Sequence, residues 1–157
     1  MPLVNRVKVF RAGFVALVVT AIAVFAAPTP SMAGGDQYFV ACEGVWASCQ
    51  TGTKVAGPVG VCLMADAYYH STIVCIDYDG DYVYVKDNKA DGQSAMARID
   101  SDRGDVLTRY CRNTHGNGTW ARCNFNWSEA GEKTVYGGHL INYATMPVDY
   151  LWSFSNN

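Results

Sequence analysis

Six cysteines constrain the fold of this chain more than any other feature of its sequence. Their number is even, and no two of them have the close Cys-x-x-Cys spacing that zinc sites use. We therefore predict three disulfide bonds, formed in an oxidising compartment. The sequence allows many pairings, and we favour the sequential one because the last two pairs have spacings that cross a hairpin. The predicted bonds join Cys42 to Cys49, Cys62 to Cys75 and Cys111 to Cys123.

The N-terminal segment has the organisation of a secretory signal peptide. Three basic residues come first, an apolar run covers 12–27, and the small-residue sequence Ser31-Met32-Ala33 forms a cleavage site. The apolar run is shorter than the roughly 20 residues that a membrane-spanning helix needs. We therefore predict a signal peptide over 1–33 and a secreted, extracellular domain over 34–157.

Removal of this leader makes the chain acidic. It takes away three of the 12 basic residues and none of the 14 acidic ones, so 9 basic residues remain against 14 acidic ones. A negative surface disfavours nucleic acids and anionic membranes as partners. The remaining length of about 124 residues is typical of one domain with its own hydrophobic core.

The secreted part reads as a series of short strands. It has no candidate helix longer than two turns, and short apolar or aromatic runs alternate with turns rich in Gly, Asn and Asp. This pattern predicts an all-β domain, a single antiparallel β-sandwich or a barrel, stapled by the disulfides. The predicted strands lie near 37–41, 59–66, 72–78, 81–86, 93–99, 105–113, 118–127, 134–144 and 149–154.

The clearest local prediction is a hairpin from Thr72 to Lys86. The dipeptide Asp79-Gly80 suits a two-residue type I′ turn, in which both residues have positive φ. In that register Ile76 faces Val83, and Val74 faces Val85. These four β-branched residues form one apolar face, so we predict that they lie in the core.

A second hairpin is predicted from Asp105 to Trp127. A two-residue Asn117-Gly118 turn would point Cys111 and Cys123 to opposite faces, which excludes their bond. A three-residue loop over 116–118 sets the two cysteines opposite each other, and we adopt that register. Its predicted core face consists of Leu107, Cys111, Cys123, Phe125 and Trp127, with Arg109 as an intruding charge.

The other face of this hairpin is the predicted ligand site. It would place Arg112 directly opposite Arg122, an unfavourable pair that a carboxylate would relieve. Arginines, amides and flat rings suit a carbohydrate, a peptide or a carboxylate. The alternative is an internal network in which Asp100, Asp102 or Glu129 pairs with the arginines. The predicted ligand-binding residues are Tyr110, Arg112, Trp120, Arg122, Asn124 and Asn126.

No catalytic or metal motif stands out. The three histidines, His70, His115 and His139, are scattered, and no serine lies in a Gly-x-Ser-x-Gly elbow. Asp77, Asp79 and Asp81 alternate as calcium ligands do, but turn formation explains them better. We therefore predict no cofactor and no metal.

Three functions remain open at this point. The first is a secreted, non-enzymatic binding module for carbohydrate or a cell-surface polymer. The second is an inhibitor of an extracellular protease or other hydrolase, acting through a disulfide-braced loop over 44–48 or 112–122. The third is a small secreted enzyme. The expected partner is thus a polysaccharide or an extracellular protein.

A resemblance points to the same compartment. The run from Asp87 to Ala95, followed by Cys111-Arg112-Asn113 and Gly118-Thr119-Trp120, resembles small secreted proteins of actinobacteria. The likeness covers roughly residues 60–130. It implies a Gram-positive, exported, disulfide-bonded β-domain. The group has no established activity, so no residue role is transferred from it.

Overall fold

The computed structural model describes residues 42, 44–67, 70–139 and 148–155. They form ten strands and one 3₁₀ turn, and they contain no helix long and apolar enough to cross a membrane. The predicted signal peptide and the strand predicted near 37–41 lie outside the described residues. In chain order the elements are β1 (Ala47–Thr51), β2 (Thr53–Val55), β3 (Val61–Ala67), β4 (His70–Asp77), η1 (Tyr78–Gly80), β5 (Tyr82–Asp87), β6 (Ala95–Ser101), β7 (Thr108–Asn113), β8 (Trp120–Asn124), β9 (Glu132–His139) and β10 (Val148–Ser155).

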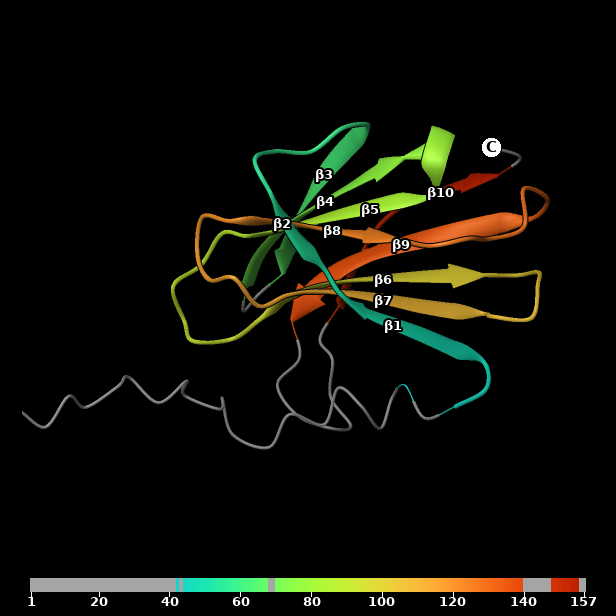
Figure 1. The fold of residues 1–157 in the computed structure, drawn as a ribbon, viewed down its shortest axis with the longest axis horizontal. Coiled ribbons are helices and arrows are strands. Elements are labelled where there is room, and N and C mark those ends of the chain that lie inside the picture. The colour runs from blue at the N-terminus through green and yellow to red at the C-terminus, as the bar shows by residue number, and fades with distance from the viewer. Residues whose placement is uncertain (1–41, 43, 68–69, 140–147, 156–157) are drawn as a thin grey trace, which may run out of the picture. The chain divides into compact units, whose positions relative to one another are not determined.

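The strands form two five-stranded sheets that pack on each other (Figure 1). Sheet A has the order β1-β7-β6-β9-β10, and sheet B has the order β2-β8-β5-β4-β3. Neighbouring strands are antiparallel except β1 and β7, which are parallel. The all-β prediction is confirmed, and of its two forms the structure has the sandwich.

The β1–β2 segment links the two sheets. It pairs with β7 in sheet A, changes sheet at Gly52 and then pairs with β8 in sheet B. A Cβ atom at Gly52 would lie 2.8 Å from Cβ of Ala121 and 3.1 Å from the Arg122 nitrogen. Only glycine lets the chain pass this close. Neither strand is among those predicted, because neither has the alternating apolar residues typical of a half-buried strand.

The core lies between the sheets and consists of small and β-branched side chains from both. All four residues predicted from the first hairpin, Val74, Ile76, Val83 and Val85, are fully buried there. Sheet A contributes Ala95, Ala97, Ile99 and Val135. The predicted pairs Ile76–Val83 and Val74–Val85 are present, so the register is confirmed.

The turn of that hairpin differs from the prediction. Residues 78–80 form η1, and the positive φ falls on Asp81 (53°) instead of on Asp79 and Gly80. The Asp77 carboxylate caps the turn by accepting a hydrogen bond from the Asp79 N–H at 3.3 Å. Asp81 accepts hydrogen bonds from the backbone N–H of Phe125 through its carbonyl and of Trp127 through its carboxylate, both at 3.1 Å. These tertiary contacts outweigh the local preference for a two-residue turn.

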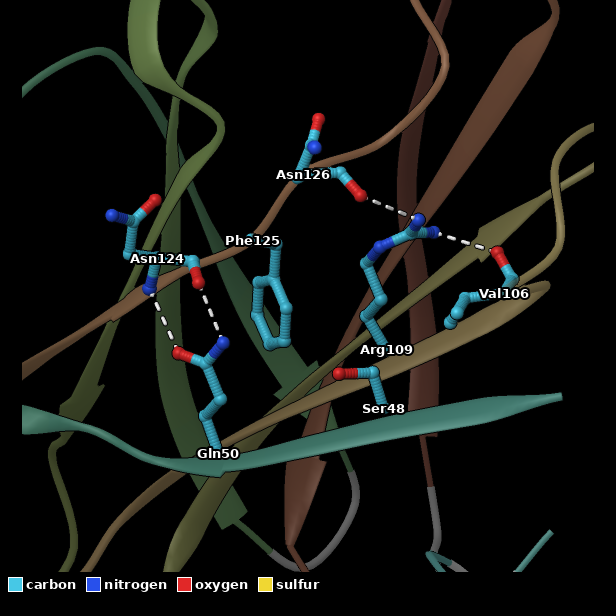
Figure 2. A pocket seen from close by; sticks show the side chains of 7 residues that line it. All are labelled: Ser48, Gln50, Val106, Arg109, Asn124, Phe125 and Asn126. Atoms are coloured by element: carbon cyan, nitrogen blue, oxygen red, sulfur yellow. Dashed lines mark hydrogen bonds between the residues drawn. The ribbon is translucent and has the colours of Figure 1, made fainter. Parts of the chain in front are cut away.

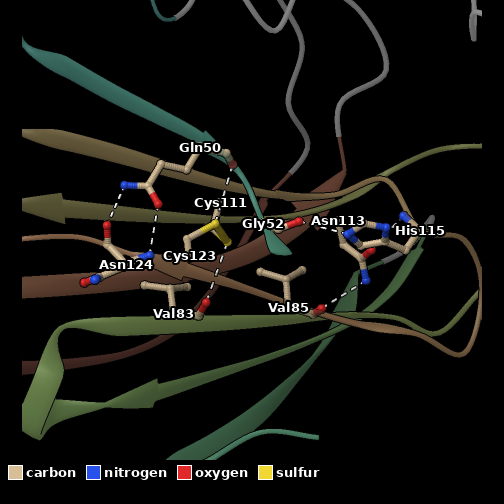
Figure 3. The surroundings of a disulfide bond; sticks show 9 residues. All are labelled: Gln50, Gly52, Val83, Val85, Cys111, Asn113, His115, Cys123 and Asn124. Atoms are coloured by element: carbon tan, nitrogen blue, oxygen red, sulfur yellow. Dashed lines mark hydrogen bonds between the residues drawn. A yellow bond between two sulfur atoms is a disulfide. The ribbon is translucent and has the colours of Figure 1, made fainter. Parts of the chain in front are cut away.

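The predicted second hairpin is wrong. β7 lies in sheet A beside β6 and β1, whereas β8 lies in sheet B beside β5 and β2. The Cys111–Cys123 bond exists, with a Cα–Cα distance of 5.8 Å, but it crosses the core between the sheets (Figure 3). The spacing of Cys111 and Cys123 fits a bond between neighbouring strands and a bond between two sheets equally well. With β7 and β8 in separate sheets, both strands bury an apolar face against the core.

Beyond the disulfide, a buried amide also joins the sheets (Figure 3). Asn113, at the end of β7, donates a hydrogen bond through Nδ2 to the carbonyl oxygen of Val85 at 3.1 Å. The same Nδ2 donates to the carbonyl oxygen of Thr119 at 2.8 Å. The Asn113 side chain therefore fixes the connection from β7 to β8 as it crosses from one sheet to the other.

The sequential disulfide pairing is confirmed throughout. Cys62–Cys75 is a cross-strand bond of the β3–β4 hairpin, with a Cα–Cα distance of 4.0 Å. Cys42–Cys49 closes the turn that precedes β1, with a Cα–Cα distance of 5.7 Å.

The predicted facing pattern survives the change of sheet. Cys111, Cys123, Phe125 and Trp127 are buried, and Arg109 is buried with them. Leu107 is the exception, because it lies before β7 begins and is exposed.

Candidate binding sites

The six predicted ligand-binding residues do not form one surface. Cys111 and Cys123 point into the core, so the residues that alternate with them point to the outer faces of two different sheets. Arg112 is aligned with Thr51 and Met96, and Arg122 with Thr53 and Tyr84. The predicted repulsion between the two arginines therefore does not exist. Tyr110 and Arg112 lie on sheet A, Trp120 and Arg122 on sheet B, and Asn124 and Asn126 at the rim of a pocket.

On the outer face of sheet B, the chain's own cations cover the aromatic rings. The Arg122 guanidinium lies 4.8 Å from the centre of the Tyr82 ring, and Lys86 Nζ lies 5.9 Å from the Trp120 ring. Cation–π contacts of this kind stabilise the fold. Arg122 thus has a partner within the chain, as in the internal network considered from the sequence, but that partner is the Tyr82 ring and not a carboxylate.

On the outer face of sheet A, three tyrosines and one arginine form a line that we call the tyrosine row. Arg98 on β6 is aligned with Tyr110 on one side and Tyr136 on the other, and Tyr136 is aligned with Tyr150. Tyr150 is 61% exposed, and Tyr110 and Tyr136 are half-buried. The row therefore crosses four neighbouring strands on one face of the domain.

Contacts within the tyrosine row hold its side chains in place. The Arg98 guanidinium lies 5.3 Å from the Tyr136 ring centre, and the rings of Tyr136 and Tyr150 pack edge to face at 6.2 Å. Arg98 also pairs with Asp100, donating from Nε to Oδ1 at 2.8 Å. The hydrogen bond to Asp100 raises the pKa of Arg98 above its ordinary value, against the opposing effect of burial.

Polar groups lie beside the tyrosine row. The next line across the sheet consists of Thr108, Asp100, Thr134 and Ser153. The Thr108 hydroxyl donates to Asp100 at 3.0 Å, and the hydroxyls of Thr134 and Ser153 lie 3.2 Å apart. This face therefore combines flat rings with hydroxyl and carboxylate groups.

The turn closed by Cys42–Cys49 presents two apolar side chains to solvent. Val45 is 79% exposed and Trp46 is 63% exposed. The turn is nonetheless anchored: Ala47 N donates to the Gly44 carbonyl at 3.1 Å, and the Trp46 carbonyl accepts from Leu107 N at 2.9 Å. The turn includes the loop over 44–48, one of the two predicted from the sequence to inhibit a hydrolase.

A pocket of about 410 Å³ opens between β1 and the segment after β8 (Figure 2). At one end the Gln50 amide bonds the backbone of Asn124 as a neighbouring strand would, donating to its carbonyl at 2.5 Å and accepting from its N–H at 2.9 Å. Gln50 belongs to β1 in sheet A and Asn124 to β8 in sheet B, so these two hydrogen bonds join the sheets. The lining residues are Ser48, Gln50, Val106, Arg109, Asn124, Phe125 and Asn126.

Arg109 lines the pocket although only 4% of its surface is exposed. Its Nη1 donates to the Ser101 hydroxyl at 3.1 Å and to the Val106 carbonyl at 2.9 Å, and its Nη2 donates to the Asn126 carbonyl at 2.9 Å. Burial lowers the pKa of Arg109 below its ordinary value, and the negative charge of Asp81 opposes that shift. The sequence predicts this arginine in a core-facing position but indicates no role for it.

The described residues do not gather the ligands typical of a metal centre. Among them, no cluster of three or more His, Cys, Asp or Glu side chains could hold a metal ion. The His115 ring nitrogen lies 2.9 Å from the Gly52 carbonyl, and His139 is buried in β9. Nothing is described for the His70 side chain.

Together these features define an all-β, disulfide-bonded, two-sheet domain. Comparison of the chain with protein-family models, with curated proteins and with solved structures gives no match. The resemblance to secreted actinobacterial proteins remains a prediction.

Proposed function

We propose that this protein is a secreted, non-enzymatic module that binds a polysaccharide or another cell-surface carbohydrate polymer on its tyrosine row. The alignment of Tyr110, Arg98, Tyr136 and Tyr150 across neighbouring strands carries this proposal. The three disulfides are consistent with an extracellular protein. The predicted signal peptide supports the same compartment.

The chemistry of the row suits an extended sugar chain. Strands lie about 4.8 Å apart, so side chains aligned across four strands form a line that several sugar units can follow. Aromatic side chains contact the apolar C–H faces of sugars and offer a polar tip at the same time. The Arg98–Asp100 pair and the adjacent hydroxyls supply donors and acceptors for sugar hydroxyls. Because these groups already hold one another, little ordering is needed on binding.

Retention on insoluble chitin, cellulose and peptidoglycan tests this function. We expect the mature protein to bind at least one of them, and Tyr150→Ala to weaken that binding by about fivefold, because one aromatic contact contributes about 1 kcal/mol. Tyr150 is the most exposed ring of the row, so its loss should leave the fold intact.

Trp120→Ala is the matched control, since it removes a ring from the outer face of the other sheet. It should bind as the unmodified protein does. Failure of the protein to bind any of the three polymers, or a loss on Trp120→Ala that Tyr150→Ala does not cause, would refute carbohydrate binding on the tyrosine row.

A second function, inhibition of an extracellular protease, is favoured by the Val45–Trp46 turn. An inhibitory loop must project its side chains while staying ordered before it binds. This turn is closed by Cys42–Cys49, tied to the backbone of Leu107, and topped by an exposed tryptophan, a residue type enriched among binding hot spots.

Inhibition assays with subtilisin-like, trypsin-like and metalloproteases test this second function. If one protease is inhibited, Trp46→Ala should raise the inhibition constant by about 30-fold, the effect of losing a hot spot of about 2 kcal/mol. Val59→Ala, which truncates another exposed apolar residue outside the turn, serves as the control and should leave inhibition unchanged. Inactivity against all three classes would exclude a protease inhibitor of these types.

A further inference from the structure

The pocket beside Arg109 contains a buried positive charge that has no carboxylate of the described residues in direct contact with it. No carboxylate of the described residues forms an ion pair with the guanidinium, and the Asp81 carboxylate, which acts on it at longer range, bonds the Trp127 N–H. A buried cation without a counter-ion is unfavourable, and proteins normally compensate for it. An anion in the pocket would provide that compensation.

The guanidinium also has unused donors. It carries five N–H groups, and the protein accepts hydrogen bonds from two on Nη1 and one on Nη2. The Nε hydrogen and the second Nη2 hydrogen have no acceptor among the described residues. A planar group with two oxygens can accept from both, as carboxylates do in bidentate contacts with arginine.

We propose that this pocket binds a small ligand through a carboxylate group held by Arg109. The volume of about 410 Å³ is within the range of small-molecule sites. Phe125 and Val106 contribute apolar side chains to the lining, and Ser48, Asn124 and Asn126 contribute polar groups (Figure 2). The ligand therefore carries a carboxylate beside a short apolar or flat portion.

The lining favours a carboxylate over a phosphate. Arg109 is the one charged residue among those described as lining the pocket, so a monoanion balances it. A phosphate dianion would call for a second cation. The site is also preformed, because hydrogen bonds to Ser101, Val106 and Asn126 fix the guanidinium, and the Trp127 ring lies 6.0 Å from it.

Matched probes with and without a carboxylate test this proposal on the unmodified mature protein. In the first pair, N-acetylphenylalanine represents a peptide C-terminus and its amide is the neutral control. In the second pair, glucuronate represents an acidic sugar and glucose is the neutral control. Benzoate represents a free acid. By NMR titration at millimolar concentrations, at least one carboxylate should shift the backbone resonances of Ser48, Arg109 and Phe125, and should bind at least about tenfold more tightly than its neutral counterpart.

Two variants separate this site from the tyrosine row. Arg109→Lys keeps the charge but loses the planar fork, so it should weaken carboxylate binding by about tenfold or more. Tyr150→Ala should leave carboxylate binding unchanged, which makes a failure here distinguishable from a failure of polysaccharide binding. The titration of the unmodified protein decides the question even if Arg109→Lys does not fold. Absence of shifts in the pocket with every carboxylate, equal affinity for acid and neutral probes, or shifts centred on Arg98 or Arg122 would overturn the proposal.

Discussion

Replacing Cys111 and Cys123 together by alanine is expected to lower the free energy of unfolding by about 3 to 4 kcal/mol. The bond closes a loop of sequence separation 12, and its loss frees the unfolded chain. Both sulfur atoms also lie in the core, so their removal leaves a cavity between the sheets. Urea unfolding of the variant, with the other two disulfides intact, measures the difference as a shift of the midpoint.

The double replacement of Cys42 and Cys49 is the matched control for this experiment. That bond closes a shorter loop, of sequence separation 7, at a half-buried position outside the core. Its loss should lower the free energy of unfolding by about 2 kcal/mol. A Cys111/Cys123 variant as stable as the Cys42/Cys49 variant would contradict the view that the cross-sheet bond is the stronger link.

Asp81→Ala is expected to lower the free energy of unfolding by about 2 to 3 kcal/mol. Alanine would have to adopt a left-handed conformation at φ 53°, which costs about 1 to 2 kcal/mol. It would also leave the buried Trp127 N–H without its acceptor, with a penalty of about 1 kcal/mol or more. The same unfolding measurement applies.

Two further substitutions at Asp81 separate these contributions. Asp81→Gly keeps the backbone conformation and loses the acceptor, so its loss of stability should be about half that of alanine. Asp81→Asn keeps both the conformation and an oxygen acceptor, and should lose less than about 1 kcal/mol. An asparagine variant as unstable as the alanine variant would show that the negative charge itself matters, through its attraction to Arg109.

The predictions that held depend on short-range patterns. The register of the β4–β5 hairpin follows from alternating β-branched residues, because a shift by one position would turn Val74 and Ile76 toward solvent. The inward direction of Cys111, Cys123 and Phe125 follows from the same alternation. The disulfide pairing followed from spacing, although for Cys111–Cys123 the hairpin argument behind it was wrong.

The predictions that failed required knowledge of distant partners. Alternation shows which side of a strand is buried, but not which sheet the strand joins. β7 and β8 have the right composition for a hairpin, and only their pairing with β6 and β5 separates them. β1 has little apolar alternation, so its parallel pairing with β7 left no trace in the sequence.

The binding surfaces show the same division. From the sequence, Asn124, Asn126 and Tyr110 were candidates, and Arg109 was an anomaly among apolar neighbours. The tyrosine row needed β6, β9 and β10 to be placed beside β7, and the pocket needed Gln50 to reach the backbone of Asn124. By itself the sequence determined the strand character of most of the described chain and the inside or outside position of most side chains in its strands, because these depend on neighbours along the chain. Only the tertiary structure decided which strands share a sheet and which side chains share a surface, because those depend on contacts between segments far apart in sequence.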